Sequence, residues 1–468
     1  MHWYFGYGAG LDFKNGSPAP DTTGNMYFDE ACFTMSDTCG NLLFYGNPDT
    51  IFNKNHLMMD NGDLIPPSLP FVNPTEMVCI PQPGNDSLFY LFYTTDGTYF
   101  NKLFYAIINI KENEGLGSVI SKDNILLDTL VSEKVAAVKH CNGTDYWITG
   151  KRGIGIAPNY LGASELFTWL LTESGINTTP VISDIGKRFF ELNGGNFKFS
   201  PNGSKAAEVV MYPDWISMAD SSYFQLYDFD DCTGIFSNPV LIPFPCPYGI
   251  AFSLDNTKLY TAVYSECVVD TFFLAQYDIS NYDSTAIVNS KFILRKGNAF
   301  AYDGMQLAID GKIYVCDWDT TDLFAAITSS QNLGVISNPN ASGLACNYYN
   351  DTVFLGGKMQ SNGLPDFVDS FFSSFIYQNC DIGIREIYSD DIIMLYPNPA
   401  NDFLNIQCNR SGNIEIKIYN ITGKLCMEKT ISGENTVLDI NSFSSGLYFI
   451  QLNLNNNHSF INLKFIKL

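Results

Sequence analysis

Basic side chains are scarce in this sequence. Its 468 residues include 26 Lys and Arg against 49 Asp and Glu, and the formal net charge is −23. Proteins that bind phosphate groups need clustered Lys and Arg, and a strongly acidic chain is repelled by phosphate. The composition therefore excludes a nucleic-acid partner and attachment to an anionic membrane surface.

Long apolar runs are missing as well. No stretch reaches the roughly 18 apolar residues that a membrane-spanning helix needs. Met1 is followed by HWYFGYGAG, which has neither the basic start nor the apolar core of a secretory signal peptide. We therefore expect no transmembrane span and no cleavable signal peptide within this sequence.

Histidine is rare, with 4 copies, and the common catalytic motifs do not occur. There is no GxSxG, HExxH, P-loop or CxxC, and His140–Cys141 is the only adjacent pair of metal-ligand types. Zinc needs several converging ligands, usually in closely spaced pairs. We predict no catalytic residue, no metal site and no cofactor.

Two carboxylate clusters lie in turn-like sequence. They are YDFDD, with Asp228, Asp230 and Asp231, and CDWDTTD, with Asp317, Asp319 and Asp322. Calcium takes about six to eight oxygen ligands, and neither cluster has the EF-hand order of Asp, Asn and Gly. We interpret both clusters as caps of turns between strands.

A glycine-rich stretch and the tryptophans also favour structural roles. KRGIGIAPNY, residues 151–160, lacks the phosphate-binding spacing and a following helix, so we expect a loop at a sheet edge. Tryptophan could stack on sugar rings, but between packed sheets it is usually part of the core. The five tryptophans are Trp3, Trp147, Trp169, Trp215 and Trp318.

The 12 cysteines are spread thinly along the chain. An even number of scattered cysteines in an acidic, Lys-poor chain fits an oxidising, extracellular setting. Cys232 and Cys246 flank one connection and are the best candidates for a disulfide, with buried free thiols as the alternative.

Short apolar strands alternate with Gly, Asn, Asp and Pro turns through most of the chain, and helical periodicity is scarce. One theme occurs three times: FKFSPNGSKAAEVVM (197–211), IAFSLDNTKLYTAVY (250–264) and MQLAIDGKIYVCDW (305–318). Each copy has a strand, a polar turn, a Lys and a second strand. The first two are followed by strands that end in FQLYDFDDCTG and LAQYDIS.

A repeat of roughly fifty residues with four antiparallel strands is a propeller blade, and such blades must stack into a ring to bury their faces. Weaker copies occur around residues 24–55, 77–111 and 135–172. We predict an all-β fold in which residues 1–380 form a β-propeller of about seven blades, with six or eight as alternatives. YYNDTVFLGG (348–357) would be completed by the N-terminal strand, which closes the ring.

Several stretches resemble the propeller domain of secreted Bacteroidetes surface proteins. They are HWYFGYGAGLDFKNGSP, DTCGNLLFYGN, FSPNGSK, YGIAFSLDNTKLY, QLAIDGKIYV and GLPDF, and together they cover residues 2–372. That family has no established catalytic signature, so the resemblance implies a fold and a location but no chemistry.

The last part of the chain resembles the C-terminal sorting domain of type IX secretion substrates. The order YPNPANDFLNI, IKIYNITGKL, LDINSFSSGLYFIQL and KFIKL covers nearly all of residues 395–468. Prolines cannot sit inside a paired strand, so they mark a turn that leads into an alternating run. We predict an Ig-like β-sandwich over 395–468 after a connector at 381–394, with a Cys408–Cys426 disulfide as one possibility.

The resemblance implies a sorting signal that includes Pro397, Asn398, Pro399, Gly423, Gly446 and Lys464. It also implies recognition by the type IX machinery, cleavage within about 380–396 and a secreted or outer-surface location. Irregular, carboxylate-bearing chain in this connector would be accessible to a protease.

Two classes of function remain. The first is a non-enzymatic binding or adhesion module for an extracellular glycan or protein, and the missing catalytic motifs favour it. The second is a secreted hydrolase or lyase that acts on a polysaccharide or peptide at the propeller channel. Two carboxylates about 5 to 10 Å apart in an aromatic-lined central cleft would favour the enzyme.

Overall fold

The computed structural model describes residues 1–14, 16–64, 76–94, 102–129, 131–153, 163–189, 195–210, 222–263, 272–297, 300–319, 330–374, 393–396, 400–408, 413–432, 435–454 and 460–467. The chain separates into two compact units, residues 1–377 and 378–468, and each is described by itself. Among the described residues, no helix has the length and apolar character needed to cross a membrane.

Six antiparallel blades follow one another in the first unit. The first blade consists of β4 (Phe33–Ser36), β5 (Leu42–Gly46), β6 (Thr50–Asn53) and β7 (Met58–Asp63). The second consists of β8 (Met77–Pro81), β9 (Leu88–Thr94), β10 (Leu103–Asn109) and β11 (Ser118–Leu127). The third consists of β12 (Val131–Lys139), β13 (Tyr146–Arg152), β14 (Ala163–Thr172), β15 (Gly175–Ile176) and β16 (Val181–Phe189). The outer strands β7 and β11 also pair in parallel, which joins the first two blades into one eight-stranded sheet.

The other three blades have four strands each. They are β17 (Phe197–Phe199), β18 (Lys205–Val210), β19 (Tyr223–Asp230) and β20 (Ile235–Pro243); β21 (Pro247–Phe252), β22 (Lys258–Val263), β23 (Phe272–Asp278) and β24 (Phe292–Gly297); and β25 (Phe300–Leu307), β26 (Ile313–Asp319), β27 (Asn332–Ile336) and β28 (Tyr348–Phe354). Short helices α1 (Glu112–Gly115) and α2 (Ser284–Asn289) and the 3₁₀ turn η2 (Gly343–Cys346) lie within connections.

The three sequence repeats are the first hairpins of the last three blades. In the hairpin β17–β18, Ser200 N donates to Lys205 O at 2.9 Å and Gly203 lies at φ +76°. The other two hairpins close their turns with the same kind of backbone hydrogen bond. Glycine adopts this left-handed conformation without steric cost. The residues of the turn therefore determine this hairpin locally.

In the first two copies, the Lys of the repeat forms a cross-strand ion pair with an Asp of the third strand. Lys205 Nζ lies 2.8 Å from Asp228 Oδ1, and Lys258 Nζ lies 3.0 Å from Asp278 Oδ2. In both cases the two residues are direct partners in the strand register. An ion pair therefore joins the second and third strands in these two blades, whereas Lys312 of the third copy pairs with Asp310 in its own turn at 3.0 Å.

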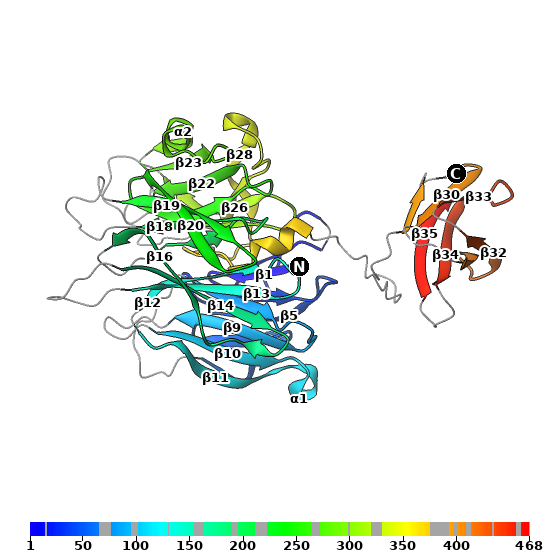
Figure 1. Cartoon of the computed structure of the whole chain (residues 1–468), viewed down its shortest axis with the longest axis horizontal. Helices are drawn as coiled ribbons and strands as arrows, with labels where there is room; N and C mark the ends of the chain where they lie inside the picture. The colour runs from blue at the N-terminus through cyan, green and yellow to red at the C-terminus, as the bar shows by residue number, and fades with distance from the viewer. Residues whose placement is uncertain are drawn as a thin grey trace. The chain divides into compact units, whose positions relative to one another are not determined.

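Contacts between the first strands turn the blades into a ring. β4 contacts β8, β8 contacts β12, and the series continues through β17, β21 and β25. An N-terminal sheet of β1 (His2–Phe5), β2 (Ala9–Asp12) and β3 (Ala19–Pro20) fills the remaining gap. Its strand β1 contacts β4, and the ring centroid of Trp3 lies 5.4 Å from that of Tyr314 in β26. Residues 1–374 thus form a β-propeller whose described strands make seven blade-like units (Figure 1).

The predicted strand pairing at the closure is wrong. β28 pairs with β27 as the fourth strand of the sixth blade, and the N-terminal strand β1 pairs with β2. The turn η2 already returns the chain beside β27, so the sixth blade needs no strand from the N-terminus. The two ends of the domain still meet, because Tyr7 N donates to Met359 O at 2.9 Å.

Residues 359–374, here called the closing segment, return from the sixth blade to the centre of the ring. Backbone hydrogen bonds fix its path: Gln360 N to Ser330 O, Gly304 N to Asn362 O, Gly363 N to Asp29 O and Asp366 N to Cys32 O. A Cβ on Gly363 would lie 2.0 Å from the Glu30 carbonyl oxygen, so the stretch GLPDF needs its glycine for this close approach. The segment ends in the 3₁₀ turn η3 (Asp369–Ser374).

The second unit is a small sandwich of two sheets. One has β29 (Ile393–Tyr396), β30 (Phe403–Cys408) and β33 (Asn435–Asp439), and the other has β31 (Asn413–Asn420), β32 (Leu425–Ser432), β34 (Gly446–Leu454) and β35 (Phe460–Lys467). Ile414, Ile416 and Ile418 point into its core, while Lys417 pairs with Glu415 on the outside. This alternation is the period of two expected for strands that bury one face.

We predict that Trp3→Ala destabilises the propeller by about 3–5 kcal/mol, because Trp3 is fully buried and joins the N-terminal sheet to the sixth blade. Urea unfolding followed by fluorescence measures the change. Tyr27→Ala is the control, since Tyr27 is 65% exposed and should change stability little. Equal effects of the two substitutions would contradict closure by the N-terminal sheet.

Candidate functional sites

Six polar side chains meet where the first strands of the blades approach one another. This axial network consists of Glu76, Lys134, Lys198, Gln306, Asp366 and Asp369, each no more than 9% exposed. Glu76 precedes β8, Lys134 lies in β12, Lys198 in β17 and Gln306 in β25, whereas both aspartates belong to the closing segment. Four blades and the closing segment therefore contribute to one buried cluster.

Lys198 holds the closing segment to the fourth blade. Its Nζ donates to Asp366 Oδ1 at 2.7 Å and to Gln306 Oε1 at 3.0 Å, and Gln306 Nε2 donates to Asp369 Oδ1 at 2.7 Å. Burial lowers the pKa of Lys198, but the charges of Asp366 and Asp369 raise it more, so the pKa lies above its ordinary value. The ammonium group stays charged at neutral pH.

Glu76 accepts three hydrogen bonds at the start of the second blade. Phe197 N donates at 2.7 Å, Val135 N at 3.2 Å and Asn196 Nδ2 at 3.3 Å. These donors favour the carboxylate, but burial and the nearby charge of Asp366 outweigh them and raise the pKa of Glu76 to about 8. Glu76 thus ties the second, third and fourth blades together and titrates near neutral pH.

The other two axial carboxyl groups are shifted in the same direction. Burial raises the pKa of Asp369 to about 6 against the opposing effect of Lys198. Burial also raises the pKa of Asp366, again with Lys198 opposing it. A buried ionised carboxylate is costly unless it is paired, and this cluster holds more carboxylates than ammonium groups.

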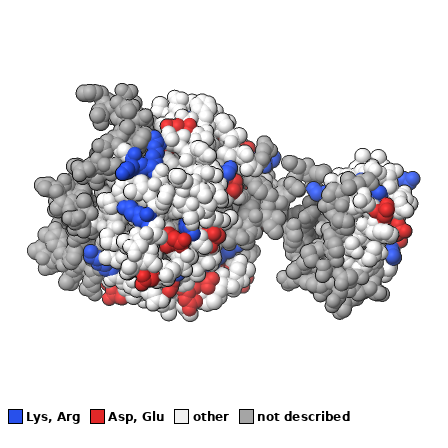
Figure 2. All heavy atoms as spheres, turned by 90° about the horizontal axis from the view of Figure 1, so that it is seen from above, with Lys and Arg blue, Asp and Glu red and all other residues white. Residues whose placement is uncertain are grey.

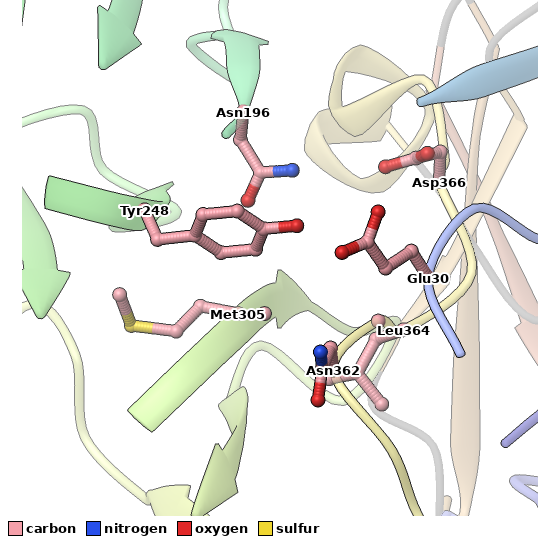
Figure 3. Close-up of a pocket in the computed structure, with 9 residues that line it drawn as sticks. Glu30, Asn196, Tyr248, Met305, Asn362, Leu364 and Asp366 are labelled. Carbon is pink, nitrogen blue, oxygen red and sulfur yellow. The ribbon is translucent and has the colours of Figure 1, made fainter. Parts of the chain in front are cut away.

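A pocket beside Asp366 is lined by Glu30, Asn196, Tyr248, Gly304, Met305, Asn362, Gly363, Leu364 and Asp366, and is called the axial pocket. Figure 3 shows the side chains of Tyr248, Glu30 and Asp366 pointing toward one another. Its cavity volume is about 10 Å³, which is room for about one water molecule. A sugar ring or a peptide does not fit this space.

In the first carboxylate cluster Asp230 caps a turn, as the sequence predicts, whereas Asp228 lies inside β19 and pairs across strands. Asp228 accepts from Lys205 and from Asn238 Nδ2 at 2.7 Å. Asp230 accepts from Cys232 N at 2.9 Å. The Asp231 carbonyl oxygen accepts from Trp147 Nε1 at 2.8 Å, so this turn also locks onto the third blade.

Asp317 differs from the rest of the second cluster because it is buried. Tyr348 OH donates to its Oδ2, and burial raises the pKa of Asp317 to about 7. The side chains of Asp319 and Asp322 lie outside the described residues. Asp317 therefore joins β26 to β28 within the sixth blade instead of capping an exposed turn.

The predicted Cys232–Cys246 disulfide is wrong. Cys232 is bonded to Cys141, and Cys246 is also disulfide-bonded, but not to Cys232. Cys141 N donates to the Asp231 carbonyl oxygen at 3.1 Å, which brings turns of the third and fourth blades together. Cys141 and Cys232 lie near Asp231, but as disulfide sulfurs they offer no thiolate to a metal. His140 therefore has no cysteine thiolate next to it in the sequence with which it could bind a metal ion.

The described tryptophans are core residues. Trp3 and Trp169 are fully buried, and Trp147 is nearly so. The side chains of Trp215 and Trp318 lie outside the described residues, as do residues 154–160 of the glycine-rich stretch. On the face shown in Figure 2, basic and acidic side chains both lie in separate small groups on a mostly uncharged surface.

Three of the predicted sorting residues can be placed in the sandwich. Gly423 has φ +78° in the turn between β31 and β32, where Asn420 Oδ1 accepts from Thr422 N and Lys424 N. Gly446 begins β34, and Lys464 is exposed on β35. Pro397, Asn398 and Pro399 lie outside the described residues.

The first and last sorting motifs meet in the fold. Ala400, which follows Pro399 in the sequence, pairs in parallel with Lys467, and Ala400 N donates to Ile466 O at 2.8 Å. β35 lies at the end of the described order β32-β31-β34-β35. Lys464 and Ile466 point outward from it, whereas Phe465 is buried in the sandwich core. The C-terminal residues thus present an apolar and basic edge beside the start of the domain.

The predicted sandwich disulfide between Cys408 and Cys426 does not form, because Cys426 is an exposed free thiol. The axial network was not predicted either. Its signal in the sequence was a Lys or Glu inside an otherwise apolar strand, as in FKF and VSEKVAAVK. Such a residue is expected to be paired inside the fold.

Because its pKa is raised in the folded protein, Glu76 holds a proton between about pH 4.5 and 8 that the unfolded chain releases. Its contribution to stability is complete below this window and is lost as the pH rises through it. We predict that Glu76→Gln reduces the loss of unfolding free energy between pH 5 and 8 by up to about 1.4 kcal/mol per pH unit. Urea titrations across this range measure the slope.

The slope is the readout because the single amide oxygen of Gln replaces two carboxylate oxygens that accept from Phe197 N and Val135 N, so the substitution should also lower stability at every pH. Glu112→Gln on the exposed helix α1 is the matched control. An unchanged pH slope in Glu76→Gln would show that Glu76 does not carry the proton.

Comparison with known proteins identifies the second unit. Residues 394–467 match the family described as the secretion system C-terminal sorting domain. Beta-agarase A of Zobellia galactanivorans is 38% identical over 61 residues, which are 13% of this chain and 11% of that protein. The match spans about a tenth of the relative's length, so it says nothing of a shared activity.

Several solved structures are similar to this chain at low sequence identity. PorZ, an essential surface component of the type IX secretion system of Porphyromonas gingivalis, is 11% identical with TM-score 0.31, over 90% of this chain and 62% of that chain. Sqt1 of Chaetomium thermophilum is 13% identical with TM-score 0.38, over 75% of this chain and 78% of that chain. Similarity at this level carries no argument about function.

The family match agrees with the motifs of the sequence and with the two-sheet sandwich that residues 393–467 form. Residues 394–467 are therefore a type IX C-terminal sorting domain, and the chain is a secreted or cell-surface protein of the Bacteroidetes type.

Proposed function

We propose that this protein is a non-enzymatic propeller module that the type IX machinery exports and that binds an extracellular glycan or protein. The observation that carries the export half is the sorting domain at residues 394–467. The binding half is supported by the propeller fold, because binding residues commonly lie on loops that a rigid scaffold positions.

The size of the axial pocket supports binding over catalysis. Two carboxylates, Glu30 and Asp366, do line it beside Tyr248, as a glycoside hydrolase would require. The space admits about one water molecule, however, and Asp366 is paired with Lys198. The alternative, a hydrolase or lyase acting at the channel, would need this ion pair to open before a substrate could enter.

A glycan array probed with the propeller separates these two functions. A binding module retains its glycan unchanged, whereas a hydrolase or lyase shortens it and releases new reducing or unsaturated ends. Product analysis by mass spectrometry after long incubation detects even slow cleavage. Release of shortened products that is abolished by Asp366→Asn would overturn the non-enzymatic proposal.

The domain limits belong to the proposal: a propeller over 1–380, a connector over 381–394 and the sorting domain over 395–468. Cleavage within about 380–396 would separate the two parts after export. The closing segment ends at Ser374, ahead of the connector, so the propeller would keep all of its axial network after such a cut.

We expect two truncations to differ sharply. Removal of residues 378–468 should leave the melting temperature of the propeller unchanged within a few degrees, because the closing segment remains. Removal of residues 359–468 should abolish cooperative unfolding, since Lys198 and Gln306 lose Asp366 and Asp369. Calorimetry of both fragments measures this. If the shorter deletion also unfolds the propeller, the two units share a core and the proposed limits are wrong.

Deletion of the last residues, KFIKL, tests the sorting role in the native host. We expect the propeller to accumulate in the periplasm at uncleaved mass. The deletion removes Lys467, which pairs with Ala400, and the exposed Lys464 from strand β35. Cell fractionation with mass spectrometry measures location and mass. Substitution of exposed Thr422 by Ala is the control for a general effect on the sandwich. Surface delivery of the deletion variant at normal mature mass would refute the sorting role.

A further inference from the structure

Two turns of neighbouring blades bring three metal-binding side chains together. Cys141 lies in the turn between β12 and β13, and Asp231 and Cys232 lie in the turn between β19 and β20. Their ligand atoms, two Sγ atoms and one carboxylate oxygen, all lie within 4.8 Å of one another. Among the residues that the structure describes, no other group of three Cys, His, Asp or Glu side chains converges in this way. The fold thus gathers two sulfurs that are 91 residues apart beside a carboxylate.

Hydrogen bonds hold the two turns against each other without help from the sulfurs. The Asp231 carbonyl oxygen accepts from Cys141 N at 3.1 Å and from Trp147 Nε1 at 2.8 Å. Within the second turn, Asp230 Oδ1 accepts from Cys232 N at 2.9 Å. We therefore expect the three side chains to stay close together when the bond between the sulfurs is open.

The Cys141–Cys232 disulfide is accessible to thiols in solution. Both of its cysteines are exposed, whereas the disulfide-bonded Cys39 is partly buried and the disulfide-bonded Cys246 is fully buried. Every chain begins with thiols, and an exposed disulfide exchanges readily with external thiols. Reduction by an external dithiol delivers two electrons and two protons to the sulfurs, and the dithiol closes to its own disulfide. Two thiols then lie beside the Asp231 carboxylate.

We propose that the reduced form of this pair of turns is a zinc site. Its ligands are the thiolates of Cys141 and Cys232 and the carboxylate of Asp231, with a water molecule in the fourth position. Zinc takes sulfur at about 2.3 Å and carboxylate oxygen at about 2.0–2.2 Å in tetrahedral geometry, which places the ligand atoms roughly 3.4–3.8 Å apart. The three ligand atoms already lie near this separation. Calcium and magnesium prefer oxygen ligands, so two thiolates select zinc.

His140 is not needed as a ligand of this site. Its Nδ1 lies 3.8 Å from Cys141 Sγ, but it already accepts from Asn142 N at 3.0 Å. Since Cys141 and Cys232 are exposed, solvent can reach the fourth position. The sequence prediction of no metal site would therefore be wrong for the thiol form of the protein.

The joint between the third and fourth blades would then exist in two chemical states. In the thiol form, Zn²⁺ displaces the two thiol protons and links the turns through its ligands. Exchange with an external disulfide removes two electrons from the thiolates, closes the Cys141–Cys232 bond and releases Zn²⁺. The external disulfide takes these electrons and two protons from solvent and becomes two thiols. The turns stay joined in both states, while zinc is bound in one and released in the other.

The test uses the full chain with Cys426→Ser, because Cys426 is an exposed free thiol. A limiting amount of a dithiol opens the accessible disulfides and is removed by gel filtration without oxygen. Alkylation with iodoacetamide followed by mass spectrometry should show that Cys141 and Cys232 are labelled. CoCl₂ serves as a spectroscopic probe for the zinc site. It should give a thiolate-to-cobalt charge-transfer band and the intense d–d bands of a tetrahedral ion, at about one ion per chain, and ZnCl₂ should displace it.

Two comparisons make the assignment specific. Asp231→Asn should weaken Co²⁺ and Zn²⁺ binding by about tenfold or more, whereas Asp145→Asn, which removes a carboxylate from the same pair of turns, should change it by less than about twofold. The chain that keeps its disulfide should show no charge-transfer band, and this comparison decides alone if a variant fails to fold. Bands of equal strength with and without reduction, equal affinities of the two variants, or labelling that spares Cys141 and Cys232 would overturn the zinc site.

Discussion

The fold depends on one buried ion pair that crosses the centre of the ring. Lys198 of the fourth blade binds Asp366, which lies 168 residues later in the closing segment. Both groups are nearly removed from solvent, so neither can lose its partner without leaving a costly buried charge. The closing segment is thereby fixed, and through it the sixth blade, the N-terminal sheet and the first blade are held in one closed ring.

The position of this closure explains how a propeller can carry a separable sorting domain. All of the axial groups precede Ser374, and the core of the sandwich draws on residues from Ala400 onward. Each unit therefore has its own apolar core and its own polar contacts. The sandwich also brings its first and last motifs together at Ala400 and Lys467, so this contact lies within the sandwich itself.

Local patterns of the sequence predicted the local structure well, and failed where partners are distant. The hairpin at Ser200 follows from turn chemistry within a few residues, and the strands of the sandwich follow from apolar alternation. Cys232 was assigned to Cys246 by spacing, but the packing of two blades brings Cys141 to it. The axial pairing of Lys198 also depends on ring closure, which no short stretch of sequence encodes.

The acidic composition takes on a structural meaning in this fold. The chain has only 26 basic residues, and yet Lys134, Lys151 and Lys198 are buried. Lys151 pairs with Glu208 between the third and fourth blades, so it serves the same purpose as Lys198 at the axis. Each of these three lysines therefore contributes an ion pair or a hydrogen bond inside the ring, where Lys134 Nζ donates to the Gly195 carbonyl oxygen, and none of them contributes a surface charge.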